Sequence, residues 1–242
     1  MILEAWKGAL GLIARSRGEA LSYVAATVFG GWFYILVCGA LGVAEPYSVN
    51  QAVKAAPGLT LIAYLPGMLV GAWFGAGLAG RMIMHALGGS AERMTFYAGK
   101  WFGRKLRWDL FFMLVMFLPV PVLVMVPAGL LFAIPWMLAA LWLGVRFALW
   151  LNISVEGDLP LIESLKRSFT VTEGRFFQLL FITALPMGAL RSLHWLVSKA
   201  APGEVVLFYL KFLFDGMGYA LVLGALAFFY ARLSSPAEGT AS

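Results

Sequence analysis

The sequence predicts an all-α integral membrane protein with six transmembrane helices arranged in three hairpin units. Of its 242 residues, 62% are hydrophobic and 12% are charged, whereas soluble domains are about half apolar and a quarter charged. The apolar residues also come in runs of about 20, the length that a helix needs to cross a bilayer. Because backbone groups in lipid must be hydrogen-bonded within the segment, we expect these runs to be helices.

The six expected spans follow from the apolar runs and the turn signals between them. The stretch 108–153 is too long for one helix, and the only turn-like break near its middle is "VPAG" at 126–129. Before each hairpin we expect a cytoplasmic amphipathic helix that lies in the membrane interface, at 2–15, 91–108 and 159–171. The expected spans are 21–43, 59–80, 108–126, 130–153, 176–198 and 205–233.

The interface helix at 159–171 separates two spans and carries a clear apolar periodicity. Leu161 or Ile162, then Leu165, then Phe169 recur every three or four residues, which predicts one buried apolar stripe. Gly174 is expected to stop this helix before the next span. We therefore expect a separate short helix rather than an extension of the fourth span.

The basic residues predict the orientation in the membrane. The formal net charge is +6, and most of the lysines and arginines lie on one side of the predicted topology. By the positive-inside rule, both termini and the two long loops are cytoplasmic in a cell (inner) membrane. The basic excess is thus explained without a nucleic-acid partner. The residues on this side are Lys7, Arg15, Arg17, Arg81, Arg93, Lys100, Arg104, Lys105, Arg107, Arg146, Lys166, Arg167, Arg175 and Arg232.

The chain is expected to form a single membrane domain over residues 1–233. Interface helices followed by hairpins recur as three weak repeat units, 1–80, 81–153 and 154–233. Residues 234–242 are expected to be a short flexible cytoplasmic tail.

Charged residues inside the spans are the strongest functional signals, because ionisable groups are costly in lipid. They fit either a structural ion pair that locks the last two spans or a polar path for ions, protons or a lipid headgroup. A second ion pair, between Arg146 and Glu156, is expected near the cytoplasmic headgroups. The residues inside the last hairpin are Arg191, His194, Lys211 and Asp215.

Two further sets of residues predict packing and lipid contact. Gly67, Gly71 and Gly75 recur every four residues, which favours close approach of another helix, within the chain or in a homodimer. A basic cluster flanked by tryptophans is expected to contact anionic lipid on the cytoplasmic side, although topogenic anchoring explains it equally well. Its members are Lys100, Arg104, Lys105 and Arg107.

A pattern of spaced residues runs through 127–185. Its members are Pro135, Arg146, Glu156, Ser164, Ser168 and Gly174. With this pattern the stretch resembles the membrane domain attached to some glycerophosphoryl diester phosphodiesterases, and related stand-alone multi-pass bacterial families of unknown function. The resemblance implies a six-helix membrane module and no activity, because the catalytic residues of such fusions belong to a separate soluble domain. We carry over no catalytic or metal-binding residue.

These patterns favour a non-enzymatic membrane module, acting as a scaffold, a membrane-organising protein or a partner subunit. The alternative is a small transporter or lipid-handling protein with a polar path between the fifth and sixth spans. No cofactor, metal or catalytic residue is expected. The expected partners are anionic headgroups on the cytoplasmic side and a homodimer or another membrane protein. Ser164 and Ser168 are expected to serve helix packing or backbone hydrogen bonding.

The predicted topology can be tested with compartment reporters. A reporter fused after Ser242 or inserted near Ser90 should report the cytoplasm, and one near Asn50 should report the opposite side. An external signal from the fusion after Ser242 would rule out six spans with both termini inside.

Overall fold

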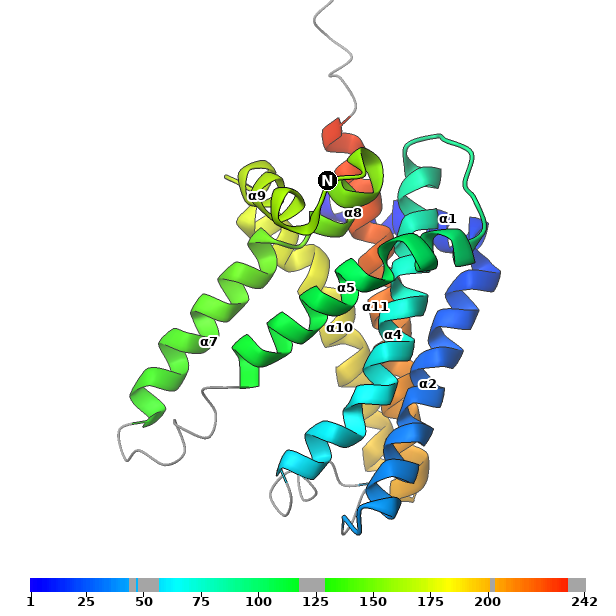
Figure 1. Cartoon of the computed structure of the whole chain (residues 1–242), viewed down its shortest axis with the longest axis vertical. Coiled ribbons are helices and arrows are strands. Elements are labelled where there is room, and N and C mark those ends of the chain that lie inside the picture. Colours follow the sequence, from blue (N-terminus) through cyan, green and yellow to red (C-terminus); the bar gives the residue numbers. More distant parts are fainter. Residues whose placement is uncertain (44–46, 48–56, 118–128, 201–202, 235–242) are drawn as a thin grey trace, which may run out of the picture.

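The computed structural model describes residues 1–43, 47, 57–117, 129–200 and 203–234, and every element in these ranges is a helix. Most of the expected spans and two of the expected interface helices correspond to separate helices (Figure 1). The helices are α1 (Ile2–Arg15), α2 (Arg17–Ala40), α4 (Pro57–Ala86), α5 (Met94–Phe117), α7 (Gly129–Arg146), α8 (Trp150–Gly157), α9 (Leu161–Val171), α10 (Phe176–Lys199) and α11 (Glu204–Ser234).

Five stretches in the described part of the chain are long and apolar enough to cross a membrane, so the chain is a helical membrane protein. The expected third span, 108–126, is not among them, and its residues 118–126 lie outside the described ranges, as do residues 235–242 of the expected tail. The five are Arg17–Ala40, Gly58–Ala86, Ile134–Gly157, Phe176–Lys199 and Glu204–Ser234.

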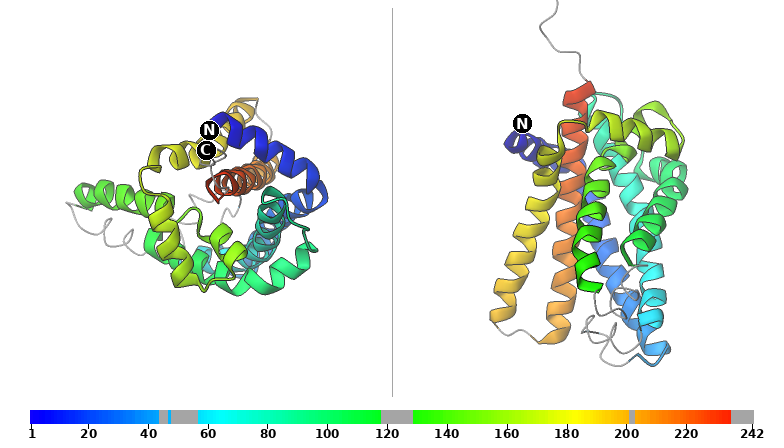
Figure 2. Two further views of the ribbon diagram at one scale, coloured as in Figure 1. Left: turned by 90° about the horizontal axis from the view of Figure 1, so that it is seen from above. Right: turned by 90° about the vertical axis from the view of Figure 1, so that its left-hand side faces the viewer.

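Helix α11 is the central element of the bundle. Seen from above, it lies inside a ring made by the other helices (Figure 2). It packs against α1, α2, α4, α8 and α10. The last described helix thus occupies the middle of the fold and joins helices from both ends of the sequence.

Two expected element boundaries differ from the structure. The interface helix expected at 91–108 and the span expected from residue 108 form one continuous helix, α5, because no proline interrupts 94–117. Conversely, the span expected at 130–153 is broken, since α7 ends at Arg146 and a turn over 147–149 leads into α8. At this turn the Trp150 N–H bonds to the Phe147 carbonyl, three residues back, so the α-helical ladder does not continue.

Helix α7 leaves the bundle at an angle, and most of its length has no helix beside it (Figure 1). It contacts α10 and α5 over only short stretches. Its large apolar residues are 39–77% exposed: Leu131, Phe132, Ile134, Trp136, Met137, Leu138, Leu141 and Trp142. In a membrane these side chains face lipid or another protein rather than water.

Most of the buried core lies at the end of the bundle that carries α1, α8 and α9, which we call the α9 end (Figure 1). Large side chains such as Met82, Trp101 and Phe229 are almost fully enclosed there. A smaller cluster around Tyr34, Cys38 and Phe208 holds α2 and α11 together nearer the opposite end. Cys38 is fully buried, as expected for a structural thiol.

The predicted glycine face of α4 is only partly a packing face. A Cβ on Gly67 would lie 3.3 Å from the Cα of Gly30, so α2 and α4 cross here backbone to backbone. A Cβ on Gly75 would lie 2.9 Å from the side chain of Lys105 in α5. A Cβ on Gly71, in contrast, would meet nothing within 4 Å, so this glycine is not part of the packed face. The close contacts are within the chain.

The two glycines form a matched pair for a stability test. Gly67→Leu should lower the thermal stability of the purified protein by about 1–3 kcal/mol, because the new side chain must push α2 away. Gly71→Leu should leave the stability nearly unchanged, because the position is open. Thermal unfolding in detergent measures both variants, and equal losses would contradict the assigned crossing point.

Candidate functional site

Asp215 of α11 brings together two of the charged residues predicted inside the last hairpin. Its carboxylate lies 3.8 Å from the Nε of Arg191 in α10 and 3.5 Å from the Nζ of Lys211 one turn away. The side chain of Asp215 is 17% exposed, whereas that of Arg191 is 69% exposed. One enclosed carboxylate therefore serves two cations from two helices.

His194, the fourth predicted residue, has a different role. Its Nε2 lies 3.1 Å from the carbonyl oxygen of Leu207, and its ring meets the edge of Phe214. Both contacts are with α11. His194 thus fastens α10 to α11 and is not joined to Asp215 by any hydrogen bond or ion pair that the structure describes.

A second ion pair inside the bundle was not predicted from the sequence. The Nζ of Lys105 lies 2.7 Å from the carboxylate of Asp109 one turn along α5, and both side chains are at most 25% exposed. The spacing of four residues is the signal that could have identified it. Lys105 was expected to contact anionic lipid, but this carboxylate engages it instead.

Tyr23 of α2 lies beside the Lys105–Asp109 pair, because a Cβ on Gly75 would contact the side chains of both Lys105 and Tyr23. Tyr23 is buried. The Lys105–Asp109 pair on α5 and the Asp215 group on α10 and α11 are thus two sets of paired charges along the helices of the bundle. We call the five charged residues the bundle charges: Lys105, Asp109, Arg191, Lys211 and Asp215.

A second concentration of polar groups lies at the elbow between α8 and α9. The carbonyl oxygen of Leu159 accepts hydrogen bonds from Arg104 at 2.9 Å, from Ser154 at 2.9 Å and from Ser164 at 3.3 Å. Three donors from α5, α8 and α9 thus converge on one acceptor. This arrangement fixes the direction in which the chain leaves α8.

Asp158 ends α8 in a left-handed backbone conformation, with φ of 49°. Aspartate is one of the few non-glycine residues that adopt this region readily. Its carboxylate lies 3.0 Å from Lys100 and 3.4 Å from Arg104, both in α5. The hydrogen bond from Lys100 is the main cause that holds the pKa of Asp158 below its usual value. These two cations are therefore engaged by the protein, although they were expected to contact lipid.

Helix α9 is a separate helix, as predicted, but its most buried face is polar. Ser164, Ser168 and Thr172 are fully enclosed, one turn apart from each other. Ile162 is 68% exposed, and Leu161, Leu165 and Phe169 are only partly buried. The predicted apolar stripe thus flanks the contact, and small hydroxyl residues form its centre because they allow close approach.

The hydroxyls of α9 hold the end of α7. The Arg146 carbonyl lacks its usual helical donor, since the turn diverts the Trp150 N–H to Phe147. Ser168 and Thr172 donate to this carbonyl at 2.9 Å and 3.1 Å. We call these contacts the α9 seam. The hydrogen-bonding role expected for Ser168 is confirmed, and Ser164 similarly bonds to the carbonyls of Leu159 and Pro160.

The expected ion pair between Arg146 and Glu156 is not formed. Glu156 accepts a hydrogen bond from the hydroxyl of Tyr230 in α11. The Arg146 guanidinium lies over the ring of Phe169, 4.0 Å from its centroid, and is buried. The break after α7 separates the two residues onto different helices, which the sequence spacing did not reveal.

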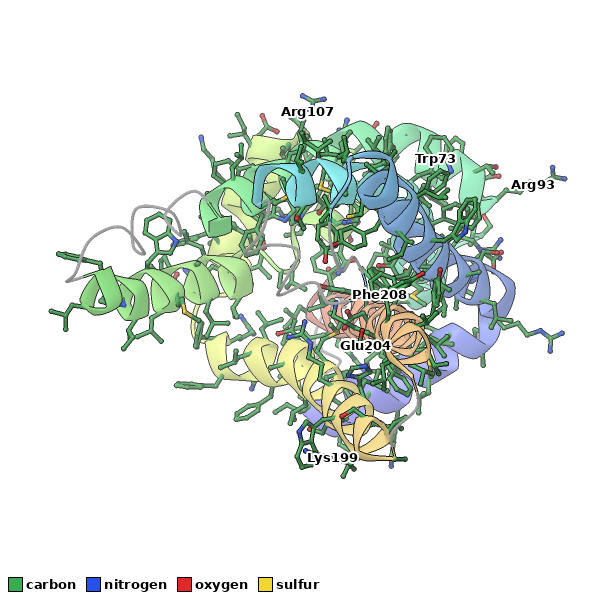
Figure 3. The ribbon with its side chains drawn as sticks, turned by 90° about the horizontal axis from the view of Figure 1, so that it is seen from below. Trp73, Arg93, Arg107, Lys199, Glu204 and Phe208 are labelled. Carbon is green, nitrogen blue, oxygen red and sulfur yellow. The ribbon has the colours of Figure 1, made fainter. Side chains whose placement is uncertain are left out.

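Arg107, the fourth member of the predicted lipid-contacting cluster, extends outward from the bundle (Figure 3). Its only described hydrogen bond is to the carbonyl of Gly103 in its own helix. It therefore remains available for an anionic headgroup. The side chain of Arg93 also points away from the bundle (Figure 3) and has no described partner.

The described residues contain no group of three or more His, Cys, Asp or Glu that could hold a metal ion. A comparison with family models, curated proteins and solved structures finds no significant match. The resemblance of residues 127–185 to the phosphodiesterase membrane domain stays a prediction. Any function must therefore be inferred from the side-chain geometry.

The contribution of Asp158 should depend on pH. Its lowered pKa means that the ion pairs stabilise the fold above the usual value of 3.8 and lose that effect as the pH falls through the folded value. Asp158→Asn, which tolerates the same backbone conformation, should lower the melting temperature at pH 7. The difference from the wild type should vanish in strongly acidic buffer, and a difference that is independent of pH would contradict the ion-pair role.

Proposed function

We propose that this chain is a non-enzymatic membrane protein that moves or positions a small anionic or amphiphilic molecule at the level of the bundle charges. The observation that carries the proposal is the pairing of Asp215 with Arg191 and Lys211, with the Lys105–Asp109 pair as a second set of charges on α5. Ionisable groups at membrane depth are costly and are by default candidates for a functional site, such as a substrate or ion path. Here they come from three helices.

The chemistry of the molecule follows from the balance of charge. The bundle charges comprise three cations and two carboxylates, so one positive charge is left over. Arg191 keeps a side chain that is 69% exposed although it contacts Asp215. A guanidinium with free donors suits a phosphate or carboxylate group. An anionic solute or the headgroup of a phospholipid fits this arrangement.

The proposed setting is a cell (inner) membrane with the α9 end in the cytoplasm. The basic residues gathered at that end support this orientation through the positive-inside rule. Six spans result if the chain after α5 completes a crossing before Gly129. The proposal keeps the predicted hairpins and repeat units, 1–80, 81–153 and 154–233, and places both termini inside.

A second candidate function, that of a partner subunit or scaffold, is favoured by helix α7. Its apolar residues are exposed around most of the helix, and it stands apart from the bundle (Figure 1). A helix from another chain would bury them. Gly71 on α4, which has open space beside it, offers a second place for close approach of a helix. If this function is correct, a Leu138→Cys variant treated with a cross-linker in membranes should form a covalent complex with a second protein chain.

Transport is tested in vesicles that contain the purified protein. One set of vesicles carries a fluorescent phospholipid in both leaflets, and an external quencher removes the fluorescence of each lipid that reaches the outer leaflet. The other set traps a small anionic dye, whose signal falls when the dye leaves the vesicle. Wild-type protein should speed the loss of one of these two signals. Asp215→Asn should slow this loss about tenfold, which corresponds to about 1.4 kcal/mol in the barrier.

The matched control is Lys166→Gln on the exposed face of α9, which should behave as the wild type. Loss of the phospholipid signal identifies lipid handling, and loss of the dye signal identifies solute transport. Folded wild-type protein that speeds neither signal, or Asp215→Asn with undiminished rates, would refute the proposal.

A further inference from the structure

Arg146, the last residue of α7, is a buried cation without a counter-ion among the residues that the structure describes. The residue is 8% exposed, and no described carboxylate pairs with it. Its nearest acidic neighbour in sequence, Glu156, is bonded to Tyr230. Its Nε is enclosed and has no hydrogen-bond partner among the described residues. Two partly buried arginines, Arg81 and Arg104, each have a carboxylate, and the partly buried Arg175 donates to the Val171 carbonyl.

The surroundings hold this cation in one position. The guanidinium lies 4.0 Å from the centroid of the Phe169 ring and 5.8 Å from that of Trp142. The α9 seam fixes the main chain of the same residue through Ser168 and Thr172. An arginine that is stacked and anchored in this way loses little further entropy when it binds a ligand.

A second donor without a described partner follows closely in the chain. Asn152 lies in the first turn of α8, is 4% exposed, and its Nδ2 has no hydrogen-bond partner in the described part of the chain. Two enclosed side chains on either side of the turn at 147–149 thus offer N–H groups without described acceptors. Leaving a buried donor without an acceptor destabilises the protein, and the cost is larger for a charged group. An anionic acceptor would remove this cost.

We propose that Arg146 binds the phosphate group of an anionic ligand at the α9 end, where α7 turns away from the bundle, with Asn152 as a further unpartnered donor across the same turn. A guanidinium matches two phosphate oxygens with two parallel N–H groups. The phosphate belongs either to a phospholipid headgroup in the adjacent leaflet or to a free phosphate in solution. This site is separate from the bundle charges, so its test does not depend on the outcome of the transport experiment.

The same end of the bundle explains why Arg146 rather than the predicted cluster takes this role. Lys100 and Arg104 pair with Asp158, and Lys105 pairs with Asp109. Arg107, the fourth member of the predicted cluster, has no described carboxylate but is exposed, so it carries no cost of burial that an anion would remove. Arg146 has a buried guanidinium and aromatic walls but no described acceptor, which is the arrangement that a bound anion completes.

The test measures how much an anion stabilises the full chain in nanodiscs. Thermal unfolding is compared in phosphatidylcholine alone, in phosphatidylcholine with phosphatidylglycerol, and in phosphatidylcholine with inorganic phosphate. We expect an anion to raise the melting temperature of the wild type, and Arg146→Met to lose this rise. Arg93→Met, which removes an exposed cation at the same end, should keep it. Arg146→Lys keeps the positive charge but lacks the paired N–H donors of a guanidinium, so it should keep part of the increase in melting temperature.

Native mass spectrometry of the wild type provides a measurement that needs no variant. The protein should retain phosphatidylglycerol over phosphatidylcholine, and Arg146→Met should weaken retention roughly tenfold or more, as expected for a charge-assisted hydrogen bond. A rise with phosphatidylglycerol alone assigns a lipid, and a rise with inorganic phosphate assigns a free anion. The proposal is overturned if the wild type shows no preference for either anion. It is also overturned if Arg146→Met lowers stability equally in all three nanodiscs, because the arginine then serves only aromatic packing.

Discussion

The fold depends on how one interrupted helix satisfies its free carbonyl groups. When α7 stops at Arg146, the carbonyl of that residue loses its helical donor, and a buried carbonyl without a donor is costly. Helix α9 supplies two hydroxyls to it, and the elbow before α9 gathers three donors on the carbonyl of Leu159. Short hydroxyl side chains can do this while the helices remain close. The packing of α8 and α9 against the rest of the bundle follows from these bonds.

The uneven distribution of the core is a consequence of this arrangement. At the α9 end, α8 enters the bundle with six consecutive buried residues, Trp150–Val155, and α11 passes beside it. Towards the opposite end α7 has left the bundle, and the packing there comes mainly from α2, α4, α10 and α11. The tightly packed end can hold charged side chains in fixed positions. The separated helix leaves apolar surface for lipid or for another protein.

Most of the partly buried cations have an acceptor within the chain. Lys105, Arg81 and Arg104 each pair with a carboxylate, and Asp215 serves two cations. Lys100 is exposed but also pairs with Asp158. Arg146 differs from these residues, because it is buried and has no described carboxylate.

The sequence by itself determined the helical membrane class, the separate helix after Pro160 and the closeness of Lys211 to Asp215, because apolar length, turn residues and i, i+4 spacing are local properties. Only the tertiary structure decided that α5 is continuous, that α7 breaks at Arg146, and that Gly67 packs while Gly71 does not. It also decided that Ser164, Ser168 and Thr172, rather than the apolar stripe, form the buried face of α9. These outcomes depend on which groups from distant segments meet, since a free carbonyl selects hydroxyls more than twenty residues away. Periodicity along one helix contains no information about that choice.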